Sequence, residues 1–203
     1  MNRSQIVAMR LIFWGVLIWV IDIQLLTPFD ILSDPIGLAL VACGQFTLIR
    51  RTDDAKTRRG FMLAWGLTVL AMLGSIGAMV PWNPAGLFRQ FEAVALIAMI
   101  IFSFAMRRFV EREDLPPMIN YWRSASCWMT FTYVPMMILV EAAYVWSLAT
   151  GASMRFDGTD LPIQISLGIA ACLFVLMLIP LVQFLSAVHH TREALDRMPP
   201  ATA

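Results

Sequence analysis

The feature that most constrains this chain is the alternation of six long apolar stretches with short segments whose charges are sorted by sign. Thirteen of the fifteen Lys and Arg residues lie in alternate segments, and the intervening segments hold mainly acids. With 59% apolar and 14% charged residues and a mean hydropathy of +0.71, the chain is too apolar for a soluble domain of its size. The pattern therefore predicts an all-α, polytopic membrane protein.

A membrane-spanning helix needs about 20 residues, because each adds about 1.5 Å, and six apolar stretches are candidates, of which the second is short. We expect six transmembrane helices as three hairpins in a single transmembrane domain, residues 1–203, with 189–203 as a cytoplasmic tail. Their expected bounds are about 6–26, 35–49, 61–80, 85–106, 125–149 and 162–188. The first stretch lacks a small-residue cleavage site at its far end, which favours an uncleaved helix over a signal peptide.

The basic residues predict the orientation of the chain. They gather in the N-terminal segment, in residues 50–59 and 107–123, and in the C-terminal tail. The three other segments and their flanks hold only Arg89 and Arg155. By the positive-inside rule, both termini are expected to face the cytoplasm.

One acid falls inside an apolar stretch, where a charged side chain costs on the order of 2.5 to 3.5 kcal/mol at the bilayer centre. Glu141 shares a helical stripe with Tyr133, Met137 and Tyr144, at three- and four-residue spacing. We expect this stripe to face other helices or water rather than lipid. Two interpretations stay open: a proton- or cation-binding site, and a structural acid that is protonated or tied to a neighbouring helix.

Further acids fall in or near the segments expected on the outer side. They are Asp22, Asp30, Asp34, Glu92, Asp157 and Asp160. Together with Glu141 they could concentrate cations or bind a divalent ion through oxygen ligands. Alternatively each acts alone: Asp34 and Asp160 would cap helices, Glu92 would favour a helix N-terminus, and the loop acids would be solvated.

Two prolines lie at similar expected depths in the last two apolar stretches. Pro135 and Pro180 each remove a backbone donor and free the carbonyl four residues earlier, at Phe131 and Leu176. The functional interpretation is a hinge at both positions. The alternative is an ordinary kink of the kind common in transmembrane helices.

Other residues are expected to pack rather than to carry chemistry. The small residues Gly37 and Gly44 favour a close approach of helices in lipid. An aromatic belt near the inner interface is expected from Trp14, Trp65, Trp122 and Trp128. Small packing residues, rather than disulfides or a zinc site, are expected at Cys43, Cys127 and Cys172, which lack C-x-x-C spacing.

Several functional classes find no support in the sequence. The net charge of +1 gives no basis for nucleic-acid binding. His189 and His190 lie beyond the sixth stretch, so the membrane core holds no histidine that could ligate haem or a metal. Because the phosphate-loop, G-x-S-x-G and H-E-x-x-H motifs do not occur, a membrane-embedded hydrolase is not expected, and we assign no catalytic residue, no metal and no cofactor. A lipid-modifying enzyme would require polar residues that converge at the headgroup level, for which only the outer acids qualify.

Residues 29–37 of the first hairpin read F-D-I-L-S-D-P-I-G. This segment resembles the first hairpin of uncharacterised bacterial multi-pass membrane proteins that read close to F-D-I-L-P-D-x-I-G, with Ser33 in place of their proline. The resemblance implies a protein of the bacterial inner membrane with an ordered first outer turn. It brings no activity with it.

Taken together, these patterns favour transport or binding of a small solute or cation through an acidic outer vestibule, with Glu141 and Asp22 as its main acids. The alternative is a non-catalytic structural or accessory subunit. Such a subunit would pack through small-residue faces against copies of itself or against another membrane complex. In either case the lipid bilayer is the expected partner.

Overall fold

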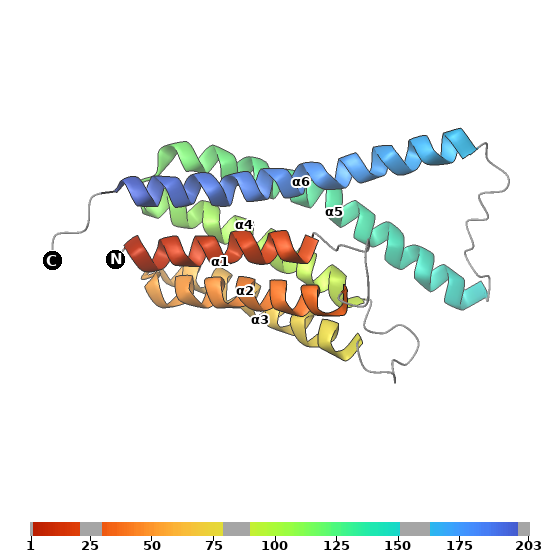
Figure 1. Cartoon of the computed structure of the whole chain (residues 1–203), viewed down its shortest axis with the longest axis horizontal. Coiled ribbons are helices and arrows are strands. Elements are labelled where there is room, and N and C mark those ends of the chain that lie inside the picture. The colour runs from red at the N-terminus through yellow and green to blue at the C-terminus, as the bar shows by residue number, and fades with distance from the viewer. Residues whose placement is uncertain (1, 21–29, 79–89, 151–162, 199–203) are drawn as a thin grey trace.

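The computed structural model describes residues 2–20, 30–78, 90–150 and 163–198, and these form six helices with no strand among them (Figure 1). The helices are α1 (Asn2–Val20), α2 (Asp30–Arg51), α3 (Ala55–Ala78), α4 (Gln90–Arg112), α5 (Pro116–Thr150) and α6 (Ile163–Arg197). Each apolar stretch of the sequence overlaps one of them. The prediction of an all-α chain is confirmed.

Three of the described helical segments are long and apolar enough to cross a membrane. They are Arg3–Val20, Ala55–Gly77 and Ala93–Arg112. In a bilayer core there is no water to pair with backbone polar groups, and a helix satisfies those groups internally. The chain is therefore a membrane protein with transmembrane helices.

The helices begin and end differently from the apolar stretches. α3 begins at Ala55 rather than near residue 61, α5 begins at Pro116 rather than near 125, and α6 continues through the expected tail to Arg197. α2 begins at Asp30, before the start expected at Pro35. Asp34 therefore lies inside α2 and not at its cap, because the helix continues through the proline at the loss of one backbone hydrogen bond.

The six helices form a closed ring. Each packs against its neighbours in sequence, and α6 also packs against α1. Consecutive helices run in opposite directions, so the start of α1 and the end of α6 lie at the same end (Figure 1). We term this the basic end; it holds residues 2–10, 50–59, 107–123 and 190–197, with thirteen of the fifteen Lys and Arg.

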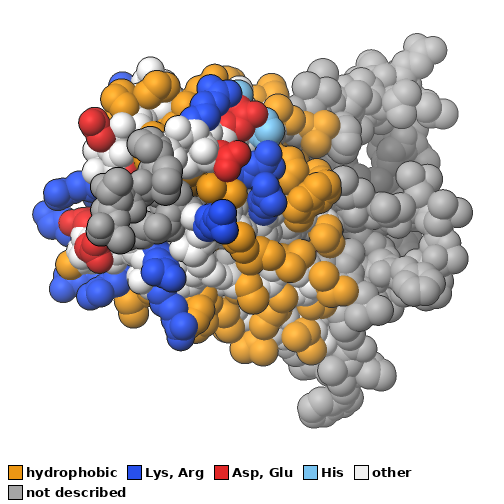
Figure 2. All heavy atoms as spheres, turned by 60° about the vertical axis from the view of Figure 1, so that its left-hand side comes forward, with side chains coloured by type: hydrophobic (Ala, Val, Ile, Leu, Met, Phe, Trp, Pro, Cys, Tyr) orange, Lys and Arg blue, Asp and Glu red, His pale blue; other side chains and the backbone are white. Residues whose placement is uncertain are grey.

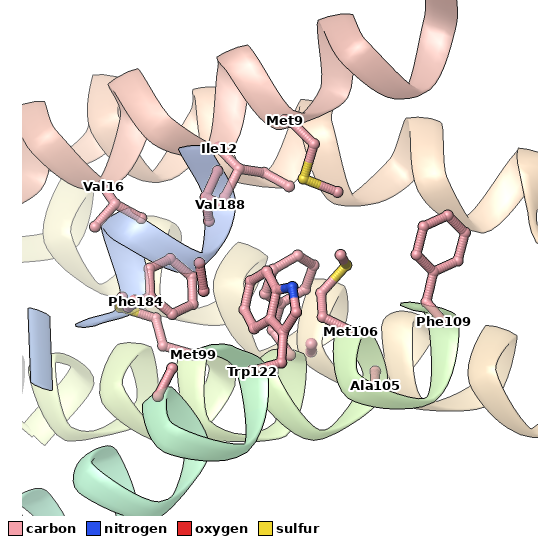
Figure 3. Close-up of a cluster of buried hydrophobic side chains, with 14 of the residues drawn as sticks. Met9, Ile12, Val16, Met99, Ala105, Met106, Phe109, Trp122, Phe184 and Val188 are labelled. Atoms are coloured by element: carbon pink, nitrogen blue, oxygen red, sulfur yellow. The ribbon is translucent and has the colours of Figure 1, made fainter. Parts of the chain in front are cut away.

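The inside of the ring is filled with aromatic, methionine and aliphatic side chains (Figure 3). Trp122 of α5 is fully buried there, and its ring meets Phe102 of α4 and Phe184 of α6 edge-on, at centroid distances of 5.9 and 5.6 Å. Its indole N–H donates to the Thr191 hydroxyl of α6 at 2.8 Å. The prediction that Trp122 belongs to the aromatic belt at the inner interface is therefore wrong. Its ring fills the interior of the bundle, and its indole N–H is paired with a side chain of the neighbouring helix.

Other side chains follow or depart from their expected exposure. Trp14 and Trp128 are 55% and 42% exposed on the surface of the bundle, as residues of an aromatic belt must be. Cys43 of α2 and Cys127 of α5 are free thiols on exposed faces, so within the described chain they are not part of the buried core. Helices that are apolar on every side give no periodic signal of which side faces inward.

Glycines bring α1 and α2 unusually close. A Cβ at Gly37 would lie 2.7 Å from the Gly15 carbonyl oxygen, and a Cβ at Gly44 would lie 2.7 Å from the Ala8 carbonyl oxygen. Real Cβ atoms essentially never approach other atoms so closely. The close packing predicted from Gly37 and Gly44 is confirmed.

We predict that Gly44→Ala destabilises the bundle by about 1 to 3 kcal/mol, because the added methyl group has no space against a rigid backbone. Gly66→Ala is the matched control, since nothing lies within 4 Å of a Cβ at that position. The measurement is the unfolding free energy of both variants in mild detergent under increasing dodecyl sulfate. Equal stability of the two variants would contradict the α1–α2 packing.

α5 and α6 are longer than the helices around them. Each has 35 residues, or about 52 Å, whereas α1 to α4 have 19 to 24 residues, or about 28 to 36 Å. Figure 1 shows the two long helices diverging as they extend beyond the other four, on the side opposite the basic end. The bundle is therefore closed at one end, while two of its helices separate at the other.

Candidate functional site

The stripe predicted to carry an ion or ligand lies on α5. Tyr133 is only 6% exposed and belongs to the main core, and Met137 is partly buried against that core. This part of the stripe faces the inside of the ring, as the sequence predicts. Glu141 and Tyr144 follow on the same helix, but their side chains lie outside the described part of the structure.

The structure describes few of the other predicted acids. Asp34 is half-buried in α2, which is not a neighbour of α5 in the ring. Asp30 and Glu92 lie near the starts of α2 and α4, with side chains outside the described residues. Outside the described residues altogether lie Asp22, Asp157 and Asp160. The convergence of these acids therefore stays a prediction.

Both candidate hinge prolines lie inside continuous helices. Pro135 is exposed on α5, and Pro180 is buried on α6. Each removes one hydrogen bond from a helix that belongs to the diverging pair. A hinge at these two positions stays a prediction.

A hollow of about 280 Å³ lies at the basic end, between the α2–α3 and α4–α5 turns. Its lining consists of Thr52, Asp53, Asp54, Thr57, Phe109, Arg112 and Glu113. The sequence analysis did not single out any of these acids. The available signal was the D-x-x-T spacing before an apolar stretch, which is typical of a helix N-cap.

The N-cap of α3 fixes one wall of this hollow. The Asp54 carboxylate accepts hydrogen bonds from the Thr57 backbone N–H at 2.8 Å and from the Thr57 hydroxyl at 2.7 Å. These bonds, helped by the charges of Arg112 and Lys56, hold the pKa of Asp54 below its ordinary value of 3.8. The Arg112 guanidinium lies 3.7 Å from the other carboxylate oxygen and so joins α4 to the α2–α3 turn.

The opposite wall comes from the end of α4. Asp114 takes a left-handed conformation with φ of 53°, and the Leu115 N–H donates to the Val110 carbonyl at 3.0 Å. This arrangement ends α4 and starts α5 after a short turn. Burial, and to a smaller degree the charge of Asp53, raises the pKa of Glu113 on this turn above its ordinary value.

Two buried glutamines were also missed by the sequence analysis. Gln5 of α1 and Gln45 of α2 are 0% and 1% exposed. Among the described residues, both amide atoms of Gln5 and the amide oxygen of Gln45 have no hydrogen-bond partner. The sequence did carry a signal for the burial of Gln5. This residue shares one side of its helix with the apolar Ala8, Met9 and Ile12.

The histidines lie on the part of α6 that contacts its two neighbours. The His190 ring is tilted against Tyr121 of α5 with centroids 4.6 Å apart, and the His189 ring centroid lies 6.4 Å from that of Phe13 of α1. The Glu193 carboxylate lies 3.4 Å from His189 and 3.7 Å from His190. Within the described ranges, no group of three or more His, Cys, Asp or Glu side chains could hold a metal ion.

The comparisons with known proteins identify no relative. No protein-family model, no curated protein and no solved structure matches this chain. The function is therefore inferred from the arrangement of the residues alone.

We predict that Asp54 stabilises the fold only where it is charged. Since its folded-state pKa is depressed, its contribution is present above its ordinary value of 3.8 and is lost as pH falls toward the lower folded-state value. The Asp54→Asn variant keeps a capping acceptor without the charge. As pH is lowered below about 4, the thermal midpoint of the wild type in non-ionic detergent should therefore fall more steeply than that of this variant.

Glu113→Gln provides a control of opposite sign. Because burial raises the pKa of Glu113, the wild type should lose stability relative to this variant as pH rises above its ordinary value of 4.5. Parallel curves for the wild type and both variants would show that neither acid is coupled to folding.

Proposed function

We propose that this chain is a six-span membrane protein, with both termini cytoplasmic, that takes up or binds a small solute or cation from the outer side. The observation that carries this proposal is the burial of Tyr133 and Met137 toward the inside of the ring. The sequence spacing continues the same stripe to position 141. An acid on this stripe is directed at the bundle rather than at lipid.

The position of Glu141 along the long helix α5 lowers the expected cost of its charge. Position 141 lies 18 residues past Arg123, which is about 27 Å along a helix axis. With Arg123 at the inner boundary of a hydrocarbon layer about 30 Å thick, position 141 lies toward the outer boundary. The cost of charge is smaller there than at the bilayer centre, and water is closer.

The two ends of the ring suit a protein that opens outward. Trp122, Phe102 and Phe184 fill the interior near the basic end, where they would block a polar path. On the other side α5 and α6 separate (Figure 1). We propose that a solute reaches Glu141 from the side on which the axes of α5 and α6 diverge, while the aromatic side chains seal the cytoplasmic half.

The positive-inside rule supports the orientation, because the basic end carries thirteen of the fifteen basic residues. With this orientation the hollow beside Arg112 is cytoplasmic. The resemblance of residues 29–37 to bacterial multi-pass proteins supports the bacterial inner membrane as the location.

A second candidate is a non-catalytic subunit of a membrane assembly. It is favoured by the exposed apolar face of α5, where the exposed fractions of Phe131, Ile138 and Leu139 are 76%, 65% and 71%. A partner helix could cover this face, and Glu141 would then serve the contact between subunits. The two candidates differ in whether water reaches position 141.

We predict that a cysteine at position 141 reacts with a membrane-impermeant thiol reagent applied from the outer side. The test uses single-cysteine variants in a chain whose Cys43, Cys127 and Cys172 are replaced by serine. Leu139→Cys is the matched control, because this exposed side chain on the same turn should face lipid and stay unlabelled. A cysteine at Asp53 should be labelled only after the cells are opened, as the proposed orientation requires.

The acid itself is tested with a hydrophobic carbodiimide, which modifies protonated carboxyl groups in membranes. Modification of Glu141, read by mass spectrometry, should fall when Na⁺, K⁺, Mg²⁺ or Ca²⁺ occupies the site. Failure to label a cysteine at position 141 would reject the transport proposal and favour the accessory subunit. Labelling at Asp53 in intact cells would reject the orientation.

A further inference from the structure

Figure 2 shows Lys and Arg side chains over the surface of the basic end. The corner formed by the end of α2 and the start of α3 carries Arg50, Arg51, Lys56, Arg58 and Arg59. Against these stand only two acids, Asp53 and Asp54, so the corner has an excess of three positive charges. Residues 107–123 have four basic and three acidic residues, an excess of one. We term the first group the α2–α3 corner.

Two of the arginines elsewhere at this end pair with glutamates on their own helices. Arg107 pairs with Glu111 at 3.1 Å, and Arg197 pairs with Glu193 at 3.8 Å. In the described part of the chain, none of the five basic residues of the α2–α3 corner forms an ion pair. All five are exposed. This corner therefore retains its charge for an anionic partner.

On both helices of the corner an arginine stands at the head of an apolar, exposed stripe. From Arg50 of α2, Phe46, Cys43 and Ile36 follow at successive intervals of four, three and seven residues toward the opposite end. The stripe of α3 runs from Arg58 through the exposed Met62 to the half-buried Trp65, at intervals of four and three residues. Periodicity places each set on one side of its helix. Each stripe therefore places an arginine at the basic end and an apolar surface, suited to contact with acyl chains, along the rest of the helix.

An aromatic contact joins the two stripes just below the charges. The Phe46 and Trp65 rings lie 5.9 Å apart, and the Arg50 guanidinium lies 4.4 Å above the Phe46 ring centroid. Arg58 precedes Trp65 by seven residues, which places it on the same side of α3 and about 10 Å along the helix. An arginine held over an aromatic ring loses less conformational freedom on binding, and Trp and Tyr are favoured at the level of lipid headgroups.

We propose that the α2–α3 corner binds an anionic phospholipid, with Arg50 and Arg58 at the phosphate and with Phe46, Trp65 and Met62 along the acyl chains. Guanidinium groups match the geometry of phosphate oxygens, and basic pockets between transmembrane helices on the cytoplasmic side suit anionic headgroups. The site rests on the insertion and orientation proposed above. It assigns a lipid partner to a surface that lies apart from Glu141.

The test is quenching of Trp65 fluorescence in nanodiscs by lipids brominated in their acyl chains. Brominated phosphatidylglycerol is compared with brominated phosphatidylcholine, and the signal of Trp65→Phe protein is subtracted to isolate Trp65. We expect selective quenching by phosphatidylglycerol in the wild type. The preference should fall about five-fold for each arginine removed in Arg50→Gln/Arg58→Gln, and high salt should weaken it.

The matched control is Arg107→Gln/Arg197→Gln, which removes the same charge from arginines already paired with glutamates. It should keep the preference for phosphatidylglycerol, and the thermal midpoint of each variant in neutral detergent reports whether it is folded. Equal quenching by both lipids in the wild type, or equal loss in both double variants, would overturn the lipid site. Absence of quenching by either lipid would instead reject the insertion of this face.

Discussion

The position of α6 between α5 and α1 is the contact on which the rest of the bundle depends. The buried hydrogen bond from Trp122 to Thr191 joins α5 to α6, and the His189 ring lies against Phe13 of α1. Because the other helices pack in sequence order, only this contact turns a row of three hairpins into a ring. The ring in turn gives Trp122, Phe102 and Phe184 a common interior to fill.

Closure also separates the two ends chemically. The basic end is closed by aromatic packing and carries the charged side chains, so its chemistry is confined to a surface: the hollow beside Arg112 and the α2–α3 corner. At the opposite end α5 and α6 outrun the other helices and diverge (Figure 1). Glu141 lies on one of these two helices, which is why the proposed binding site and the proposed lipid site are independent of each other.

The sequence predicts the helices well because a bilayer leaves the backbone no alternative to internal hydrogen bonding. A helix overlaps each of the six stretches, and Gly37 and Gly44 mark a close helix contact. Which side of each helix faces inward was harder to predict. Trp122 was assigned to an aromatic belt but is buried, because lipid and protein interiors are equally apolar and leave no periodic contrast.

At the basic end, the roles of individual acids could not be predicted from the sequence either. Asp54 and Asp114 appear in the sequence as two solvent-exposed acids among many. Their roles depend on backbone geometry: Asp54 caps α3 through Thr57, and Asp114 takes the left-handed conformation that ends α4. For Glu141, sequence and structure agree on the helix and on the inward direction of the stripe at Tyr133, and chemistry beyond that point is proposed from spacing.

Closure of the ring is tested most directly by disulfide cross-linking in membranes of a chain that lacks native cysteines. The pair Phe13→Cys/His189→Cys spans α1 and α6, and Tyr121→Cys/His190→Cys spans the α5–α6 hairpin as a positive control. We predict that mild oxidation cross-links both pairs and leaves Phe13→Cys/Leu63→Cys open. Cross-linking of the α5–α6 pair alone would contradict a closed ring and, with it, the sealed interior on which the proposed function depends.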